Sequence, residues 1–419
     1  MKILLWHGYL LGGTGSNVYT RSLARAWSRA GHEVVVFCQE PHPERYELGG
    51  ARVVRPDAGG ILPVFVLDRY EDLEARRLPE LSASEREAWV ERNAAAVREH
   101  LPADVLLTNH VLLGAPVGAA SGTPFAVKAH GSELEFALRG NPELVAWARE
   151  ALPQAKDVLA GSEHIRRVLE EVVGAGEYLE RVRIVPPGVD VDELRPEPRE
   201  QALAALVEEA RRDPPLTGER HPDPGNAERF AEFLAGEEPT VVFVGKLSRE
   251  KGVDLLLDAL ERIEARAVIV GFGPLRAELE ERAAGRRVLL SGPLEHRHLA
   301  HLWALADVSV TPSVFPEAFG MVAAEAAACG SPPLVARHSG LADIASGLEA
   351  EYPPQHRSLA GFERGDVEDL TETLRALLDL PASERRRLGE AARRAAVARW
   401  SWERIAALIL SGPWETPSA

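Results

Sequence analysis

The sequence predicts an α/β protein built of two doubly wound domains with parallel sheets. Its 419 residues are too many for a single small module, and the 45% that are hydrophobic can bury large cores. Short β-branched or apolar runs alternate with longer helical patterns, which is typical of parallel strands joined by helices. Because the alternation stops near residue 190 and then starts again, we expect two halves of similar size.

The first half opens on a short apolar run that we interpret as a buried strand. The expected strands cover residues 3–6, 34–37, 105–108, 125–128, 158–160 and 184–186, and the helical patterns cover 16–30, 83–100 and 163–173. The segment Pro186-Pro187-Gly188-Val189-Asp190 then has the restricted dihedrals of a turn or linker. We therefore assign residues 1–188 to an N-terminal domain.

The second half repeats the same order of elements. The expected strands cover residues 240–244, 267–270, 288–291, 308–312 and 333–336, and the expected helices cover 252–263, 274–284, 299–306, 321–329 and 382–400. Residues 189–400 form the C-terminal domain in this interpretation. The Pro-rich stretch 197–238, with two helix-like pieces, is predicted to be a surface insertion.

Composition excludes several classes of function. Lys and Arg total 48 against 64 Asp and Glu, and this net charge of −16 argues against a nucleic-acid partner. Two distant cysteines favour neither a disulfide framework nor a zinc site. That cysteine usage fits a reducing cytoplasm, where we expect the protein. The N-terminal run is too short for a signal peptide and no apolar run is long enough to span a membrane, so we expect no integral membrane protein.

A glycine-rich loop follows the first expected strand, at residues 12–17. Gly13 and Gly15 would let the backbone approach a ligand closely, and the following helix would offer unpaired N–H groups to an anion. The loop does not complete the GxGxxG pattern of dinucleotide-binding proteins. A tight turn without a ligand is therefore an open alternative.

Two lysines lie in the loop that follows the strand at 240–244. Lys246 and Lys251 come after Gly245 at the carboxyl end of that strand, where open α/β sheets bind ligands, so both could reach a phosphate group. The alternative is that they are solvated loop charges. The loop lacks the GxxxxGK[ST] pattern of a Walker motif.

Two glutamates eight residues apart, Glu317 and Glu325, flank the start of an expected helix. On one helix they would lie about 12 Å apart, wider than the carboxylate pairs of glycosidases, so paired-carboxylate hydrolysis is rejected. We instead place Glu317 in the loop before the helix and Glu325 one to two turns inside it. The exposed amides between them would bind an anion, and the carboxylates would accept hydrogen bonds from hydroxyls; these amides belong to Phe319, Gly320, Met321 and Val322. An amphipathic helix with a capping carboxylate is the structural alternative.

Two further motifs could belong to a functional site. Asp190-Val191-Asp192 matches the DxD metal signature, but it follows Pro187-Gly188 in the predicted linker, so we expect no metal there. His130 lies just past the carboxyl end of a strand, before a glycine that permits a sharp turn. Either a role in the site or a packing role fits His130.

At these residues the sequence resembles the retaining glycosyltransferases of family 4, which have the GT-B fold of two Rossmann-like domains facing across a cleft. The resemblance covers almost the whole chain. It is carried by the glycine loop, His130-Gly131, residues 185–190, 244–252, 270–274, 312–330, and Trp400-Ser401-Trp402-Glu403. In this fold the last helix, here 401–419, returns to the N-terminal domain.

The resemblance implies a role for each matching residue. Lys246 and Lys251 would neutralise the donor diphosphate, Glu317 would bind the sugar hydroxyls, and Glu325 would bind the ribose. His130 would lie over the sugar near the anomeric carbon. The remaining implied donor-binding residues are Gly13, Gly15, Gly245, Phe319, Gly320, Met321 and Val322, with Asn17 as a contact to the acceptor.

Two positions depart from the family pattern. Lys246 stands where arginine is usual, which keeps the charge but loses the bidentate fork. Ser339-Gly340 replaces the commoner pair of glycines.

The expected activity is therefore metal-independent transfer of a sugar, with retention, from a nucleotide diphosphate donor to an acceptor hydroxyl, with no cofactor. Residues 186–190 resemble the same segment of sucrose-phosphate and mycothiol-type transferases, which implies a UDP sugar, and a GDP sugar is possible. The mixed charges of residues 68–100 favour a small soluble acceptor over a membrane lipid. The alternatives are an epimerase acting on the nucleotide sugar and a non-catalytic partner that only binds it.

Overall fold

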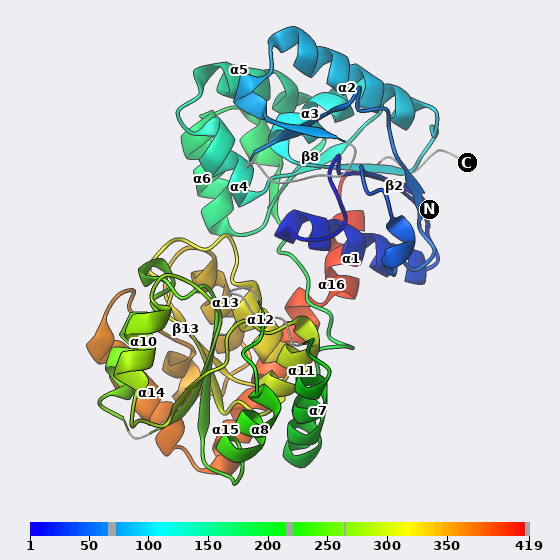
Figure 1. Ribbon diagram of the computed structural model, residues 1–419. Helices are drawn as coiled ribbons and strands as arrows, with labels where there is room; N and C mark the ends of the chain where they lie inside the picture. Colours follow the sequence, from blue (N-terminus) through cyan, green and yellow to red (C-terminus); the bar gives the residue numbers. More distant parts are fainter. Residues whose placement is uncertain (66–72, 215–220, 264, 415–419) are drawn as a thin grey trace. The chain divides into compact units, whose positions relative to one another are not determined.

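The computed structural model describes residues 1–65, 73–214, 221–263 and 265–414. Parts of three predicted segments, at 68–72, 215–220 and 415–419, lie outside these described residues. The chain divides into two compact units, one formed by Met1–Gly188 with the C-terminal stretch from Trp402, the other by Val189–Ser401 (Figure 1). Each unit is an α/β structure around its own parallel sheet.

The first unit contains a seven-stranded parallel sheet in the order β3-β2-β1-β6-β7-β8-β9. Its strands are β1 (Lys2–Trp6), β2 (Glu33–Phe37), β3 (Arg52–Val54), β6 (Val105–Asn109), β7 (Ala126–Lys128), β8 (Asp157–Ala160) and β9 (Val182–Ile184). Two further strands, β4 (Ile61–Val64) and β5 (Glu74–Arg77), pair with each other. Strand order reverses between β1 and β6, which makes the carboxyl edge of these two strands the favoured place for a ligand.

Helices cover this sheet, and the last helix of the chain is among them (Figure 1). They are α1 (Gly15–Arg29), α2 (Ala83–Arg98), α3 (Val111–Ser121), α4 (Gly131–Glu133), α5 (Pro142–Ala151), α6 (Glu163–Val173) and α16 (Trp402–Leu410). The indole of Trp27 donates a hydrogen bond to the Ala406 carbonyl, and Trp402 packs edge-on against Tyr19. These buried contacts attach α16 to α1.

The second unit contains a six-stranded parallel sheet in the order β12-β11-β10-β13-β14-β15. Its strands are β10 (Thr240–Val244), β11 (Arg266–Val270), β12 (Val288–Leu290), β13 (Val308–Thr311), β14 (Pro333–Ala336) and β15 (Gly361–Phe362). The order reverses between β10 and β13, so the loops after these two strands lie where an open α/β sheet binds its ligand. Those loops carry Lys246 and Glu317.

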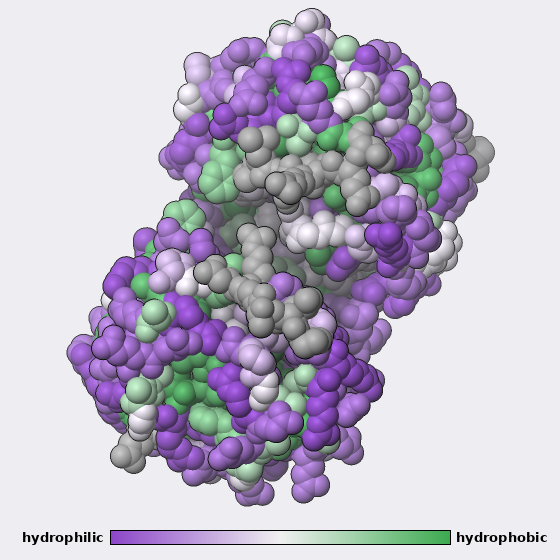
Figure 2. All heavy atoms as spheres, viewed as in Figure 1, coloured by the Kyte–Doolittle hydropathy of each residue, from purple (hydrophilic) through white to green (hydrophobic). Residues whose placement is uncertain are grey.

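The helices of the second unit include two from the predicted insertion. They are α7 (Arg199–Arg211), α8 (Asn226–Phe233), α9 (Val253–Leu260), α10 (Arg276–Ala283), α11 (His296–Ala304), α12 (Met321–Ala328), α13 (Ser339–Glu349), α14 (Val367–Asp379) and α15 (Ala382–Ala395). No helix within the described ranges is long and apolar enough to cross a membrane. The face drawn in Figure 2 is mainly hydrophilic, with hydrophobic residues in separate groups on each unit.

Several predicted boundaries were wrong. β9 covers Val182–Ile184 and not 184–186, because Pro186 has no N–H group to donate to a neighbouring strand. The helix expected at 252–263 is α9, preceded by a 3₁₀ turn (Arg249–Lys251) and ended at Leu260. The bounds of the helix expected at 382–400 are confirmed: α15 (Ala382–Ala395) continues as a π-helical turn over Ala396–Trp400.

Candidate active site

The second unit places a lysine and a glutamate in contact at the carboxyl edge of its sheet. The ammonium of Lys251 forms an ion pair with a carboxylate oxygen of Glu317. The close approach depends on Gly252, which has φ +66° and on which a Cβ would lie 2.0 Å from the Pro312 carbonyl oxygen. The structure thus joins two residues that are 66 positions apart in the sequence.

Glu317 is held from three sides. The Ser313 hydroxyl donates to the same carboxylate oxygen over 2.7 Å, and the Glu317 amide donates to the Ser339 hydroxyl over 2.9 Å. The Gly340 amide donates to the Glu317 carbonyl, also over 2.9 Å. The carboxylate is therefore fixed in one orientation before any ligand is bound.

Two residues behind Glu317 were not predicted to have a role. Ser339 has a left-handed backbone (φ +48°), unusual for a residue other than glycine, and its hydroxyl accepts the Glu317 amide. The neighbouring His338 ring donates from Nε2 to the Ser313 carbonyl over 2.6 Å. Gly340 must be glycine, because a Cβ there would lie 2.4 Å from the Phe319 Cα. The departure from a pair of glycines was the sequence signal that pointed to Ser339.

Lys246 lies in the loop directly after β10. Its side chain is exposed, and no residue of the described segments forms an ion pair with it. The Gly245 amide donates to the Val270 carbonyl, and the Leu247 amide donates to the Phe272 carbonyl, so the loops after β10 and β11 are joined. The backbone around Lys246 is thus fixed, while its ammonium is available to an anion.

The start of α12 has the geometry that the sequence predicted. Gly320 is the cap residue with φ +112°, and α12 begins at Met321, so its first amides, including that of Val322, have no acceptors within the helix. Phe319 is buried and packs edge-on against Trp400, with ring centroids 6.1 Å apart. These contacts fix the turn that presents the amides.

Glu325 lies in the second turn of α12 and is almost completely buried. Burial raises the pKa of its carboxyl group, and His296 opposes this effect. The His296 Nε2 atom lies 3.6 Å from a Glu325 carboxylate oxygen, and the imidazole itself is 68% exposed. His296 was not singled out from the sequence, because it is remote from Glu325 along the chain.

The first unit brings three imidazoles together at the carboxyl edge of its sheet. His7 follows β1, His110 follows β6 and His130 follows β7. The ring centroids of His110 and His130 are 4.6 Å apart, and those of His7 and His110 are 5.7 Å apart. His110 has φ +73° and, among the described residues, neither ring nitrogen has a hydrogen-bond partner. Only His130 was predicted; the signal for the other two was their position within two residues of the end of an expected strand.

The hydrogen bonds of His130 define its tautomer. The Asn109 amide group donates to the Thr20 hydroxyl, so its oxygen faces the His130 Nε2 atom at 2.9 Å and must accept from it. The pKa of His130 lies well below its ordinary value because of burial, the nearby Lys128 and His7. His130 is therefore a neutral imidazole whose Nδ1 atom carries the lone pair.

Lys128 is a buried cation beneath this group. Its ammonium donates to the Val185 carbonyl and lies 5.5 Å from the centre of the Tyr19 ring. Burial lowers the pKa of Lys128 to about 7. Glu133, whose carboxylate accepts the His130 amide, has its pKa raised by burial to about 7. Both shifts favour the neutral form of the side chain, so burial at this edge of the first sheet disfavours charged groups.

The glycine loop begins α1 and leaves room around its backbone. A Cβ at Gly13 (φ +91°) or at Gly15 would have no atom within 4 Å. Asn17 is buried, with its amide oxygen 2.8 Å from the His7 Nε2 atom and its nitrogen donating to the Gly12 carbonyl. Both ends of the Asn17 amide are thus used to hold the loop, and contact with an acceptor stays a prediction.

A metal site was not expected, and this expectation stays a prediction. The described part of the chain contains no group of three His, Cys, Asp or Glu side chains that could hold a metal ion. The Asp190 carboxylate of the DxD motif accepts the backbone amides of Asp192 and Glu193 at 3.1 and 3.0 Å. Those contacts give Asp190 a role in the turn.

Comparison with known proteins adds to this geometry. Residues 13–193 match the family described as Glycosyltransferase Family 4, and residues 226–395 match the one described as Glycosyl transferases group 1. A D-inositol 3-phosphate glycosyltransferase of Xylanimonas cellulosilytica is 30% identical over 94% of this chain and 90% of its own length. A GDP-mannose-dependent α-(1-6)-phosphatidylinositol dimannoside mannosyltransferase of Mycobacterium tuberculosis is 37% identical, over 41% of this chain and 42% of its own length.

Solved glycosyltransferase structures are similar to this chain over nearly its whole length. HepE of Anabaena, in complex with UDP, superposes with a TM-score of 0.67 at 18% identity, over 98% of both chains. At that identity the likeness concerns the fold alone.

Proposed function

Because this chain belongs to glycosyltransferase family 4, we propose that it transfers a sugar from a nucleotide diphosphate donor to an acceptor hydroxyl, with retention of configuration. The observation that carries the proposal is the Lys251–Glu317–Ser313 cluster beside the start of α12. It combines cationic groups, unpaired amides and an oriented carboxylate at the reversal of strand order. A diphosphate and a sugar with several hydroxyls need these three kinds of group.

The donor diphosphate would be bound by Lys246, Lys251 and the first amides of α12. Stabilisation by such fixed charges matters most as the leaving phosphate gains charge. The phosphates would compete with Glu317 for the Lys251 ammonium, and the Glu317 carboxylate would then accept hydrogen bonds from the sugar. Glu325 would bind the ribose hydroxyls.

The neutral imidazole cluster would contact the transferred sugar near its anomeric carbon. His130 has its Nε2 proton held by Asn109 and carries a lone pair on Nδ1, so it can accept from a hydroxyl without introducing a charge. Gly13 and Gly15 leave open space around their backbone for a phosphate or an acceptor. We propose that no metal ion or other cofactor takes part.

The identity of the donor and of the acceptor is a second part of the proposal. We propose a UDP sugar, on the form of residues 186–190, and a small soluble cytoplasmic acceptor, with a cyclitol phosphate as the first compound to test. The relatives named for D-inositol 3-phosphate and for GDP-mannose make these compounds part of the same screen.

The test begins with binding. UDP, GDP and ADP sugars are compared by thermal shift, since a ligand that binds only the folded state raises the melting temperature. Transfer is then measured across an acceptor panel, with and without EDTA, and NMR reports the anomeric configuration of the product. An inverted product, or a loss of rate in EDTA, overturns that part of the proposal. A donor isomerised without acceptor indicates an epimerase.

A further inference from the structure

The described parts of the predicted insertion, residues 197–238, hold the loop that follows β12. The Asp223 amide and the Asn226 side chain both donate to the Ser291 carbonyl, over 3.1 and 2.9 Å. The Arg229 guanidinium donates to the Leu290 carbonyl. The Gly271 amide in turn donates to the Gly292 carbonyl over 3.0 Å, which links this loop to the loops after β11 and β10.

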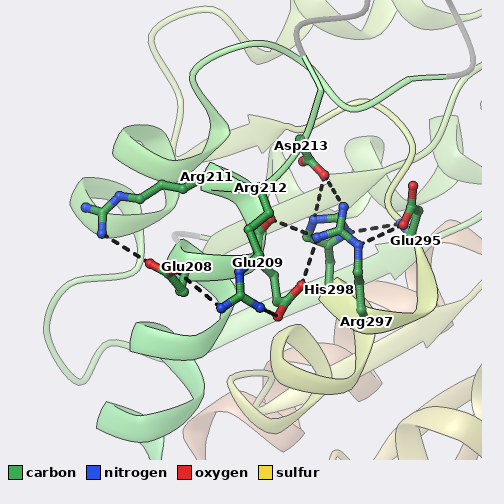
Figure 3. A network of polar contacts seen from close by, with 8 residues as sticks. All are labelled: Glu208, Glu209, Arg211, Arg212, Asp213, Glu295, Arg297 and His298. Carbon is green, nitrogen blue, oxygen red and sulfur yellow. Dashed lines mark hydrogen bonds and ion pairs between the residues drawn. The ribbon is translucent and has the colours of Figure 1, made fainter.

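The same segment also forms hydrogen bonds and ion pairs with the beginning of α11 (Figure 3). Arg297 donates to the Glu209 carboxylate and carbonyl over 2.8 and 2.9 Å, to the Glu295 carboxylate over 2.8 Å, and to the Asp213 carboxylate. One guanidinium thus joins α7 and the residues after it to the start of α11. Its planar fork of five N–H donors holds acceptors on three residues in fixed directions, a geometry that the compact ammonium of lysine does not reproduce.

His298 completes this attachment from the next position. Its Nδ1 atom accepts the Glu295 amide over 3.2 Å, so the proton is on Nε2, which lies 3.1 Å from the Asp213 carboxylate. Figure 3 shows Arg297 and His298 both directed toward Asp213. A second contact lies in the last turn of α11, where the His301 ring is 2.7 Å from the Glu197 carboxylate.

The residue that begins α11 faces the predicted donor site. His296 lies immediately before Arg297, and its Nε2 atom is 3.6 Å from the Glu325 carboxylate, while 68% of its side chain is exposed. A ligand held by Glu325 would therefore touch His296 as well. The first turn of a helix frays easily without side-chain partners, so the position of His296 depends on what holds residues 295–298.

We propose that His296 is a further donor-binding residue and that Arg297 is its positioning residue: segment 197–213 acts through Arg297 to keep the His296 imidazole beside Glu325, next to the ribose of a nucleoside diphosphate. The inference rests on the proposed function, because it takes Glu325 as the ribose ligand. It gives the insertion a role in donor affinity, in addition to its packing against α11.

The test is a double-mutant cycle read out as the Kd of UDP by calorimetry, with GDP in parallel. His296→Ala is expected to weaken binding about tenfold, and Arg297→Ala about fivefold. In the His296→Ala background, Arg297→Ala is expected to add less than about twofold, because it acts through the missing imidazole. Arg297→Lys should bind UDP more tightly than Arg297→Ala and less tightly than the wild type.

The control is Arg282→Ala. Arg282 makes a comparable set of ion pairs between α10 and α9, with Asp258 and Glu261, away from His296 and Glu325. This variant should lower the melting temperature and leave the Kd unchanged. If Arg297→Ala does not fold, Glu209→Gln weakens the same attachment and replaces it in the cycle.

The outcomes separate the two proposals. If Arg297→Ala weakens UDP binding by the same factor in both backgrounds, the residue is only structural and the inference is wrong. If the wild type binds UDP or GDP and His296→Ala binds equally well, the inference fails while the proposed function stands. If the wild type binds neither nucleotide, the proposed function fails, and the inference fails with it.

Discussion

The two sheets present opposite kinds of chemistry at their carboxyl edges. In the second unit the edge is charged, with an ion pair between Lys251 and Glu317 and an exposed Lys246. In the first unit the edge is a group of neutral imidazoles, of which His7 and His110 are buried and His130 is partly exposed, near a lysine whose pKa burial lowers to about 7. Under the proposed function, equivalent positions in two similar folds would therefore serve different groups: an anion in the second unit, and uncharged hydroxyl groups in the first.

The largest effect should follow from removing charge in the second unit. Lys251→Ala and Glu317→Gln are each expected to lower kcat/KM about 10³-fold. The first removes a fixed positive charge near the leaving phosphate, and the second removes the carboxylate that would accept hydrogen bonds from the sugar and that pairs with Lys251. Initial rates with a radiolabelled nucleotide sugar measure the effect, and circular dichroism checks the fold. Arg249→Ala, which removes a neighbouring exposed cation paired with Asp254 and Glu278, is the matched control. Full activity of either site variant contradicts the proposed roles.

A smaller loss is expected from the neutral cluster. His130→Ala should lower kcat/KM about 10²-fold, because a hydrogen-bonding group at the reacting centre is lost but no charge is removed. Since the pKa of His130 lies well below its ordinary value, its protonation should not reduce the rate between pH 8 and pH 6. A pH profile of kcat/KM measures this, with His42→Ala in the exposed part of the same unit as control. A fall in kcat/KM near pH 6.5 that is absent from His130→Ala would show that His130 takes up a proton there. That result would contradict the neutral state assigned to the first edge.

Replacing Lys128 tests whether a buried positive charge lowers the stability of the first unit. Lys128→Met is expected to stabilise the fold by about 2 kcal/mol at pH 6. Below pH 7 both folded and unfolded chains hold the lysine proton, so the wild type carries the full cost of the buried charge. Between pH 7 and the ordinary pKa of 10.5 the folded chain releases that proton first, so wild-type stability rises and the advantage of methionine shrinks.

Urea unfolding at pH 6 and pH 9 measures this difference. Lys156→Met, at an exposed lysine of the same unit, should change stability little at either pH. An equal gain for Lys128→Met at both pH values would mean that the cost of the buried charge is not the cause.

The smallest effect concerns the alignment of Glu317. Ser339→Ala removes the hydroxyl that accepts the Glu317 amide and keeps the left-handed strain, so kcat/KM should fall about fivefold. Ser339→Gly also removes the hydroxyl but relieves the strain, and the expected fall is about twofold. Ser346→Ala, at an exposed position of the same helix, is the control in the same assay. A smaller fall in kcat/KM for Ser339→Ala than for Ser339→Gly would contradict the assignment of backbone strain to this position.

Regular hydrophobic patterns explain which elements the sequence predicts well. The runs at 240–244 and 333–336 coincide with β10 and β14, because buried parallel strands are nearly continuous apolar runs. Helix α3 was missed, because most of its residues are buried and its apolar composition shows no helical period. β3 was missed because it is a short edge strand with partly exposed residues.

The sequence by itself determined the fold class, the glycine and lysine loops, and the pair Glu317 and Glu325, because each depends on residue types at short spacing. Only the tertiary structure decided which distant residues meet: His7 and His110 with His130, His296 with Glu325, and Arg297 with Glu209. Those contacts join the ends of strands and helices that are far apart in the chain. The physical reason is that a strand's carboxyl end acquires its neighbours from the order of strands in the sheet, which no local pattern encodes.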